Sequence, residues 1–174
     1  NVGKTSRHHT FFEMMGNFSI GDYFKEEAID FAYEFLFSKD YIGFDVKDAY
    51  FSVHPDDETA FNIWHKKYNI PEDRILKTEA NFWQIGDGPC GANTEIFIDR
   101  GTKYDPENIG EKLFFEDLEN DRYVEIWNIV FSQFDGKEGQ DIHTFKELPQ
   151  KNIDTGMGFE RLMSIVQNVE TNFD

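Results

Sequence analysis

The chain has 174 residues, of which 39% are hydrophobic and 17% aromatic. This length and composition predict a single domain with a real hydrophobic core and exclude a disordered chain. With 17 basic and 34 acidic residues the formal net charge is −17, which excludes general binding to a nucleic-acid backbone but not a local basic pocket.

The predicted elements begin with an extended segment, "RHHTFFEMMGNFSI" (7–20), which enters a turn bounded by Gly16 and Gly21. Asp22 then predicts the N-cap of a helix over about 22–38. Apolar residues recur in this helix at helical spacing and predict a broad buried stripe. The stripe consists of Phe24, Ala28, Phe31, Ala32, Phe35 and Leu36.

Short strands and a second helix follow. "AYFSVH" (49–54) is typical of a strand, and "PDDETAFNIWHKKYN" predicts a helix after Pro55 with Asp56 or Asp57 as its cap. Three further strands are expected near 74–78, 81–85 and 94–99. The segment "GDGPCGAN" between the last two contains Gly and Pro at turn spacing and predicts a loop.

The remaining chain contains the strongest strand signal. Segments 100–121 and 135–151 are polar and predict solvent loops, whereas "RYVEIWNIVFSQF" (122–134) predicts a long strand. Strict alternation would place Val124, Ile126, Asn128, Val130 and Ser132 on one face and Glu125, Trp127, Ile129, Phe131 and Gln133 on the other. A last helix is expected over 158–169. Hairpin-like strands with helices packed to one side predict an α+β domain, an antiparallel β-sheet flanked by helices.

Asp154 precedes an apparent Gly-Met-Gly turn and the last helix in "NIDTGMGFERLMSIVQ" (152–167). It has three possible roles: a protease aspartate, the N-cap of that helix, or a carboxylate for a ligand cation. An Asp-Thr-Gly that runs directly into a helix argues against the protease. Gly156 and Gly158 allow a ligand to approach the backbone closely, which favours ligand binding. Arg161, one turn into the helix, suits a phosphate.

Two other segments carry candidate binding residues. "RHHTFF" (7–12) combines cations with aromatic rings, which suits a stacked base with phosphates but also exposed His beside core aromatics. No third ligand stands at suggestive spacing, so no metal site is expected. Trp83, just before the glycine-rich segment, is either a packed core residue or part of a ligand pocket.

The cysteine content and the apolar runs indicate a cellular setting. Cys90 is the one cysteine, so the chain cannot form an internal disulfide. No apolar run has the length needed to span a bilayer, and no membrane partner is expected. These features favour a reducing, cytoplasmic location.

Four segments, in this order along the chain, resemble class II aminoacyl-tRNA synthetases, and among them the alanyl-tRNA synthetase family. "RHHTFFEMMGNFSIGDYFKEEAI" is similar to the second half of motif 2 and the following helix, and "NFWQIGDGPCGANTEIF" to the family's Trp and Gly-Pro-Cys segment. "RYVEIWNIVFSQF" resembles its central strand and "NIDTGMGFERLMSIVQ" its motif 3. The resemblance implies that residues 1–174 are part of a class II catalytic domain, from late motif 2 through motif 3.

The resemblance implies an alanine–tRNA ligase, which activates alanine with ATP and Mg²⁺ to alanyl-adenylate and charges tRNA(Ala). For ATP it implies Phe12, or Phe11, stacked on adenine and the Met14 backbone at the adenine edge. Arg7, His8 and Arg161 would lie near the phosphates. For alanine it implies Asp154 on the ammonium group, with Trp83, Asn128, Val130 and Gly156 shaping a small pocket.

The resemblance leaves two further functions open. One is a related ligase that adenylates an amino acid and charges a carrier protein. The other is a non-catalytic synthetase-like module that acts by binding. Most contacts with tRNA are expected outside these residues.

Overall fold

The computed structural model describes all 174 residues. Its strands are β1 Met14–Met15, β2 Ser19–Ile20, β3 Ala49–Val53, β4 Ile75–Lys77, β5 Phe82–Trp83, β6 Gly88–Asp99, β7 Tyr123–Gly136 and β8 Lys146–Gly158. Its α-helices are α1 Lys25–Phe37, α2 Glu58–Asn62, α3 Lys112–Phe115 and α4 Phe159–Val166. None of them combines the length and apolar character needed to cross a bilayer.

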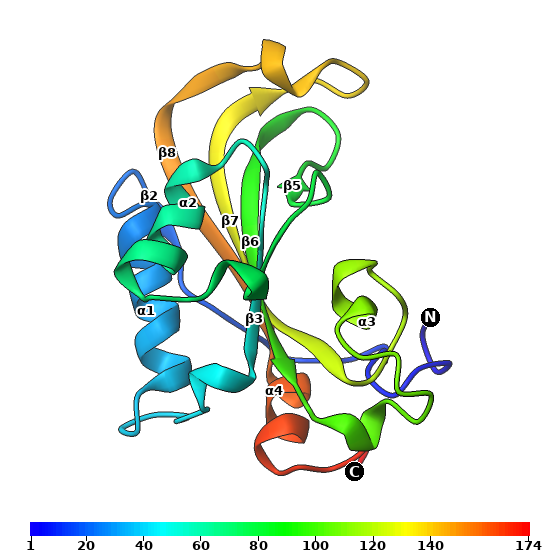
Figure 1. Cartoon of the computed structure of the whole chain (residues 1–174). Helices are drawn as coiled ribbons and strands as arrows, with labels where there is room; N and C mark the ends of the chain where they lie inside the picture. The colour runs from blue at the N-terminus through cyan, green and yellow to red at the C-terminus, as the bar shows by residue number, and fades with distance from the viewer.

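One eight-stranded sheet forms the centre of the domain, in the order β1-β8-β7-β6-β3-β4 (Figure 1). β2 also pairs with β8, and β5 pairs with β6. Every pair is antiparallel except β3 and β4, which run parallel. The predicted α+β class, with a largely antiparallel sheet, is confirmed.

The main core lies between the sheet and the helices α1 and α2, which cover one face. Helix α1 contributes its fully buried residues Ala28, Ile29, Ala32 and Leu36. Trp64, in the π-helical turn that continues α2, is fully buried, and its indole N–H donates to Thr94 Oγ1 at 2.9 Å. The opposite face carries no such helical layer over its centre, which leaves it accessible to a ligand.

Helix α1 begins later than predicted, and its buried stripe is narrower. Asp22 does not cap it, because the N-cap is Phe24, whose N–H donates to the Glu27 carboxylate at 3.4 Å. Phe31 is 44% exposed instead of buried and packs edge-on against Tyr23 at the rim of the helix. In α2 the choice between two caps is resolved, since Asp57 Oδ1 accepts from the Ala60 N–H at 3.0 Å.

The prediction of a loop at "GDGPCGAN" is wrong from Gly88 onward. Strand β6 begins there and pairs with the end of β7, with a register irregularity between Cys90 and Asn93. A Cβ on Gly91 would overlap the carbonyl oxygen of Phe131. This glycine therefore reflects a close approach of two strands, not a turn.

Both predicted solvent loops are only partly loops. Strand β7 continues to Gly136 and β8 begins at Lys146, so the connection is shorter than expected. Within 100–121, helix α3 buries Leu113 and Phe114 against Tyr50 and Tyr123. Helix α3 could not be predicted from the spacing of its apolar residues, because four residues make little more than one helical turn.

Strand β7 contains a bulge that overturns the predicted alternation of its faces. Ile96 pairs with Trp127 but Phe97 pairs with Glu125, so Ile126 is an extra residue. Ile126 and Trp127 are consecutive, and both are buried in the main core. Glu125 and Asn128 consequently lie on the same, open face, where strict alternation had separated them.

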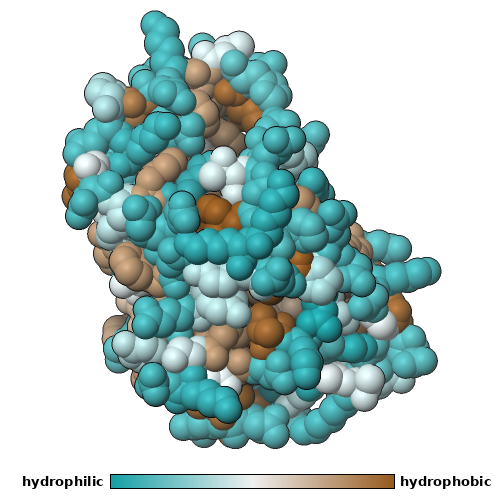
Figure 2. All heavy atoms as spheres, turned by 60° about the vertical axis from the view of Figure 1, so that its left-hand side comes forward, coloured by the Kyte–Doolittle hydropathy of each residue, from teal (hydrophilic) through white to brown (hydrophobic).

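The outer surface near α1 is predominantly hydrophilic, with small, separated apolar patches (Figure 2). This surface agrees with the formal charge of −17. A large apolar region would have indicated a docking surface for a partner.

Candidate functional site

The open face of the sheet carries a hollow of about 260 Å³ beside β1, β8 and the start of α4. The five residues implied for ATP all line it, namely Arg7, His8, Phe12, Met14 and Arg161. Gly156, implied for alanine, lines it as well. Segments from opposite ends of the chain therefore meet in one cavity.

Backbone pairing and one carboxylate hold the N-terminal segment over this hollow. Met14 pairs with Gly158 across β1 and β8. The Glu13 N–H donates to both carboxylate oxygens of Glu160, at 3.0 and 3.1 Å, and the Phe159 N–H donates to the Glu13 carbonyl at 2.9 Å. Gly156 and Gly158 place no side chain over the floor, so a flat ligand can lie against the strand.

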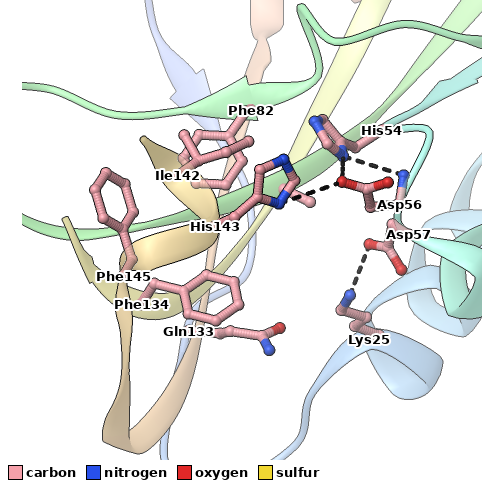
Figure 3. Close-up of a pocket in the computed structure, with 11 residues that line it drawn as sticks. Lys25, His54, Asp56, Asp57, Phe82, Gln133, Phe134, Ile142, His143 and Phe145 are labelled. Atoms are coloured by element: carbon pink, nitrogen blue, oxygen red, sulfur yellow. Dashed lines mark hydrogen bonds and ion pairs between the residues drawn. The ribbon is translucent and has the colours of Figure 1, made fainter. Parts of the chain in front are cut away.

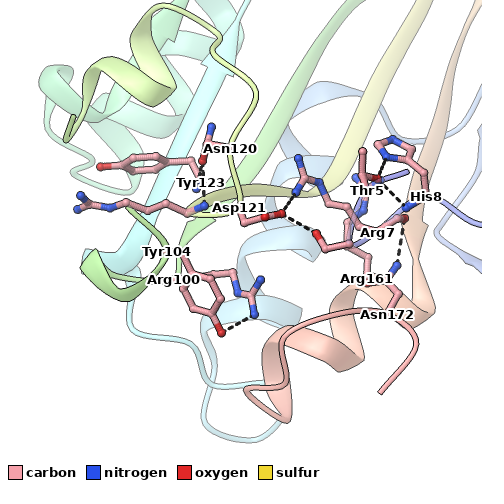
Figure 4. Close-up of polar contacts among 12 residues, drawn as sticks. Thr5, Arg7, His8, Arg100, Tyr104, Asn120, Asp121, Tyr123, Arg161 and Asn172 are labelled. Atoms are coloured by element: carbon pink, nitrogen blue, oxygen red, sulfur yellow. Dashed lines mark hydrogen bonds and ion pairs between the residues drawn. The ribbon is translucent and has the colours of Figure 1, made fainter. Parts of the chain in front are cut away.

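Two guanidinium groups line the hollow, and each lies beside a carboxylate. Arg161 Nη1 donates to the Glu125 carbonyl at 3.0 Å and lies 3.8 Å from its carboxylate. Arg7 forms an ion pair with Asp121 at 2.6 Å (Figure 4). Burial lowers the pKa of His8, and the nearby Arg161 and Arg7 lower it further, so this imidazole is neutral at pH 7.

The structure distinguishes the two phenylalanines that the resemblance left open. The Phe12 ring lines the hollow and is edge-on to His9, with 5.9 Å between the ring centroids. Phe11 is 81% exposed and does not line the hollow. Phe12 is thus the aromatic surface available to a base in this cavity.

Three other residues implied for alanine, Asn128, Val130 and Asp154, lie next to the hollow and do not line it. Asn128 pairs with Gly156, and Val130 pairs with Asp154, in adjacent positions on β7 and β8. Asp154 is exposed and lies two residues beyond Gly156 on the same face. It cannot cap α4, whose N-cap is Gly158, because β8 continues through the expected Gly-Met-Gly turn.

Trp83 lies on the short strand β5, opposite Gly91 of β6. Its neighbour Phe82 contacts His54 on the helical side, so alternation directs Trp83 toward the open face. Trp83 is half-buried and does not line the 260 Å³ hollow.

Sequence reasoning missed three polar residues of the open face: Asn93, Glu95 and Glu125. Glu95 pairs with Asn128, which in turn pairs with Gly156, so the three form one row across the sheet. Burial, followed by the charge of Glu125, raises the pKa of Glu95 to about 7. Asn93 was missed because it lies in the segment predicted as a loop, and Glu125 because the bulge changes its face. The alternation in "NTEIF" could have placed Asn93 and Glu95 on the same face.

A second hollow, of about 310 Å³, lies at the edge of the helical face and contains none of the predicted site residues (Figure 3). Lys25 forms an ion pair with Asp57 at 2.6 Å, and the Asp56 carboxylate lies 3.9 Å from His54 Nδ1 and 3.8 Å from His143 Nδ1. His54 Nε2 has no partner, but it also has almost no accessible surface. It cannot contact a ligand in the hollow, and we assign the functional site to the open face.

Comparison with known proteins shows the family of the chain. All of residues 1–174 match the family model described as tRNA synthetases class II (A). The chain is 59% identical over 176 residues to the "Alanine--tRNA ligase" of Bacillus subtilis (strain 168), and 58% over 174 residues to that of Bacillus velezensis. It is 55% identical over 174 residues to that of Lysinibacillus sphaericus. These alignments cover 100% of this chain but only 19% of each relative's length.

Proposed function

Because the chain belongs to the family of class II (A) tRNA synthetases, we propose that it is the alanine-activating part of an alanine–tRNA ligase. The reaction converts alanine and ATP to alanyl-adenylate and pyrophosphate, and the alanyl group then passes to tRNA(Ala). One observation carries the proposal. Two guanidinium groups and the exposed ring of Phe12 share a glycine-floored hollow, and the exposed carboxylate of Asp154 lies two residues beyond it on β8.

In this proposal ATP occupies the hollow. The adenine stacks on Phe12 and its edge meets the backbone of Met14, while Arg7 and Arg161 bind the phosphates. The Asp121 carboxylate holds Arg7 before ATP arrives, and phosphate oxygens replace or share this partner. Neutral His8 adds a hydrogen-bonding group without further charge.

The residues also fit a Mg²⁺ ion that arrives with ATP. Magnesium prefers one or two protein carboxylates together with phosphate oxygens and water. Glu125 lines the hollow beside Arg161 and offers such a carboxylate, whereas no three acidic, His or Cys side chains converge to form a complete protein cage. The ion would neutralise part of the phosphate charge.

Alanine would lie beyond Gly156, with its ammonium group on Asp154. Asn128 and Val130 would form the neighbouring wall and Trp83 the far side of the pocket. The alanine carboxylate attacks the α-phosphate, so a new carboxyl O–P bond forms as the bond to pyrophosphate breaks. The nucleophile is already ionised and needs no general base; the site has to align two anions and reduce their repulsion.

A pocket of this size sets a limit on specificity. Large side chains are excluded sterically, but glycine lacks only one methylene, which is worth about 1–3 kcal/mol. Serine adds only a hydroxyl group. We therefore expect weak activation of both, and a separate proofreading step in the complete enzyme. With a net charge of −17, these residues are poorly suited to the tRNA backbone, and most tRNA contacts are expected elsewhere.

The test is to substitute Asp154→Ala in the full-length protein and to measure binding of alanine and of ATP by isothermal titration. We expect alanine affinity to fall by tenfold or more, because a charge-assisted contact is worth about 1.5–3 kcal/mol. ATP affinity should change less than twofold.

Asp135→Ala is the matched control. Asp135 is also an exposed aspartate, on β7 next to β8, but it does not line the hollow. It should leave both affinities unchanged. Equal loss of alanine and ATP binding in Asp154→Ala would count against the assigned role.

A further inference from the structure

A chain of hydrogen bonds runs beneath the proposed alanine pocket, from Asn81 to Asn128. Asn81 Nδ2 donates to Ser52 Oγ at 2.9 Å, and Ser52 Oγ donates to Glu95 Oε2 at 2.9 Å. Asn93 Nδ2 donates to Asn128 Oδ1 at 2.9 Å and lies 3.4 Å from Glu95 Oε1. Three strands, β3, β6 and β7, and the segment between β4 and β5 thus share a single polar network on the open face.

The network has a defined direction. When ionised, the carboxylate of Glu95 can only accept, so Ser52 donates its single hydroxyl proton to it and accepts from Asn81. For the same reason the Asn93 amide presents its NH₂ group toward Glu95. Turning that amide over would set its oxygen against the Glu95 carboxylate, which is unfavourable when Glu95 is ionised.

The direction of these hydrogen bonds also determines the orientation of the Asn128 amide. Because Asn93 donates, Asn128 must present Oδ1 to it, and the Nδ2 group of Asn128 remains for a ligand. Asn128 is half-buried, while Asn93 is only 3% exposed and cannot itself reach a ligand. The backbone of Asn93 is also fixed, since its N–H donates to the Asn81 carbonyl at 3.0 Å and its carbonyl accepts from Asn81 Nδ2 at 3.3 Å.

We propose that Asn93 is a positioning residue for amino-acid recognition: it locks the Asn128 amide so that its NH₂ group faces the carboxylate of alanine. The inference rests on the proposed function and adds a residue that acts through another. Asp154 and Asn128 would then hold the two charged ends of the zwitterion from neighbouring positions on β8 and β7.

The test is Asn93→Asp in the full-length protein, assayed by alanine-dependent exchange of pyrophosphate into ATP. The substitution keeps the shape but replaces the donor by an acceptor, so the Asn128 NH₂ group turns away from the ligand. We expect the KM for alanine to rise at least tenfold, as for loss of one hydrogen bond to a charged group, with the KM for ATP within twofold of wild type. Asn108→Asp makes the same change at an exposed loop residue and should alter neither constant.

Since a carboxylate next to Glu95 can also impair folding, Asn93→Ala is measured in parallel. It removes the donor without adding charge and should raise the KM for alanine severalfold, whereas Asn93→Ser, which retains a donor, should restore part of the loss. An unchanged KM for alanine in Asn93→Ala, or equal rises for alanine and ATP, would overturn the inference while leaving the proposed function intact. A wild-type protein without alanine-dependent exchange would overturn both.

Discussion

At the scale of single residues, Glu95 shows how its surroundings alter an ordinary carboxyl group. Burial and the neighbouring Glu125 raise its pKa to about 7, from a usual value of 4.5. The folded protein therefore binds a proton at this site more readily than the unfolded chain. Between about pH 4.5 and 7 the free energy of unfolding falls as the pH rises, and above pH 7 the full cost of the buried charge is present.

Glu95→Gln should therefore stabilise the protein in a pH-dependent way. We expect its melting temperature to exceed that of wild type at pH 8, and the difference to shrink toward pH 5, because the amide carries no charge to bury. Thermal unfolding at both pH values measures this. Glu107→Gln, at an exposed loop position, should show no such trend, and a difference for Glu95→Gln that is the same at both pH values would contradict the argument.

Sequence reasoning reached only some of the site residues. The family resemblance of four segments implied several residues that line one hollow, namely Arg7, Phe12, Met14 and Arg161. Glu125 was assigned to the wrong face, since a bulge leaves no mark in a run of apolar residues. No local sequence pattern indicates that β7 has one extra residue relative to its partner strand at the bulge.

At the scale of elements, β6 shows why a glycine-rich segment need not be a loop. Gly91 is buried within the strand, where a side chain would meet the Phe131 carbonyl. The composition of "GDGPCGAN" is compatible both with a turn and with a strand that closely approaches another strand. The two can be distinguished only when the pairing partner is known. The period of α1, by contrast, was visible, because its buried residues recur over 13 residues.

Gly91→Ala tests this explanation. The added methyl group meets backbone, which cannot rotate away, so we expect the free energy of unfolding to fall by about 1–3 kcal/mol. Denaturant unfolding measures the change. At Gly156, also in a strand, a Cβ would lie 3.5 Å from the mobile end of Met14, and Gly156→Ala should cost far less. Equal losses at the two positions would show that strand propensity, and not the close approach, determines the cost.

At the scale of the whole molecule, the two faces of the sheet differ, because one is covered by helices and the other carries the candidate site. One face buries its apolar residues under α1 and α2, while the other bears the hollow, the polar row and Asp154. Arg122 fixes the connection between β6 and β7 to the end of β6, since it pairs with Asp99 at 2.8 Å and with Asp105 at 3.1 Å. The same connection supplies Asp121, the partner of Arg7 in the hollow.

The class of the fold could be predicted from the sequence, because many short strands without regular β-α alternation leave few other arrangements. The order of the strands could not be predicted by the same means. The single parallel pair, β3 with β4, and the pairing of β8 with both β1 and β2 depend on contacts between distant segments.

The most direct measurement is pyrophosphate exchange by the full-length protein with a series of amino acids. We predict that alanine gives the highest kcat/KM, that glycine and serine give lower but measurable values, and that leucine and phenylalanine give none, because the proposed pocket between Asp154 and Asn128 would admit only a small side chain. Absence of alanine-dependent exchange, or preference for a bulky side chain, would contradict the assignment of the open face as the site of alanine activation.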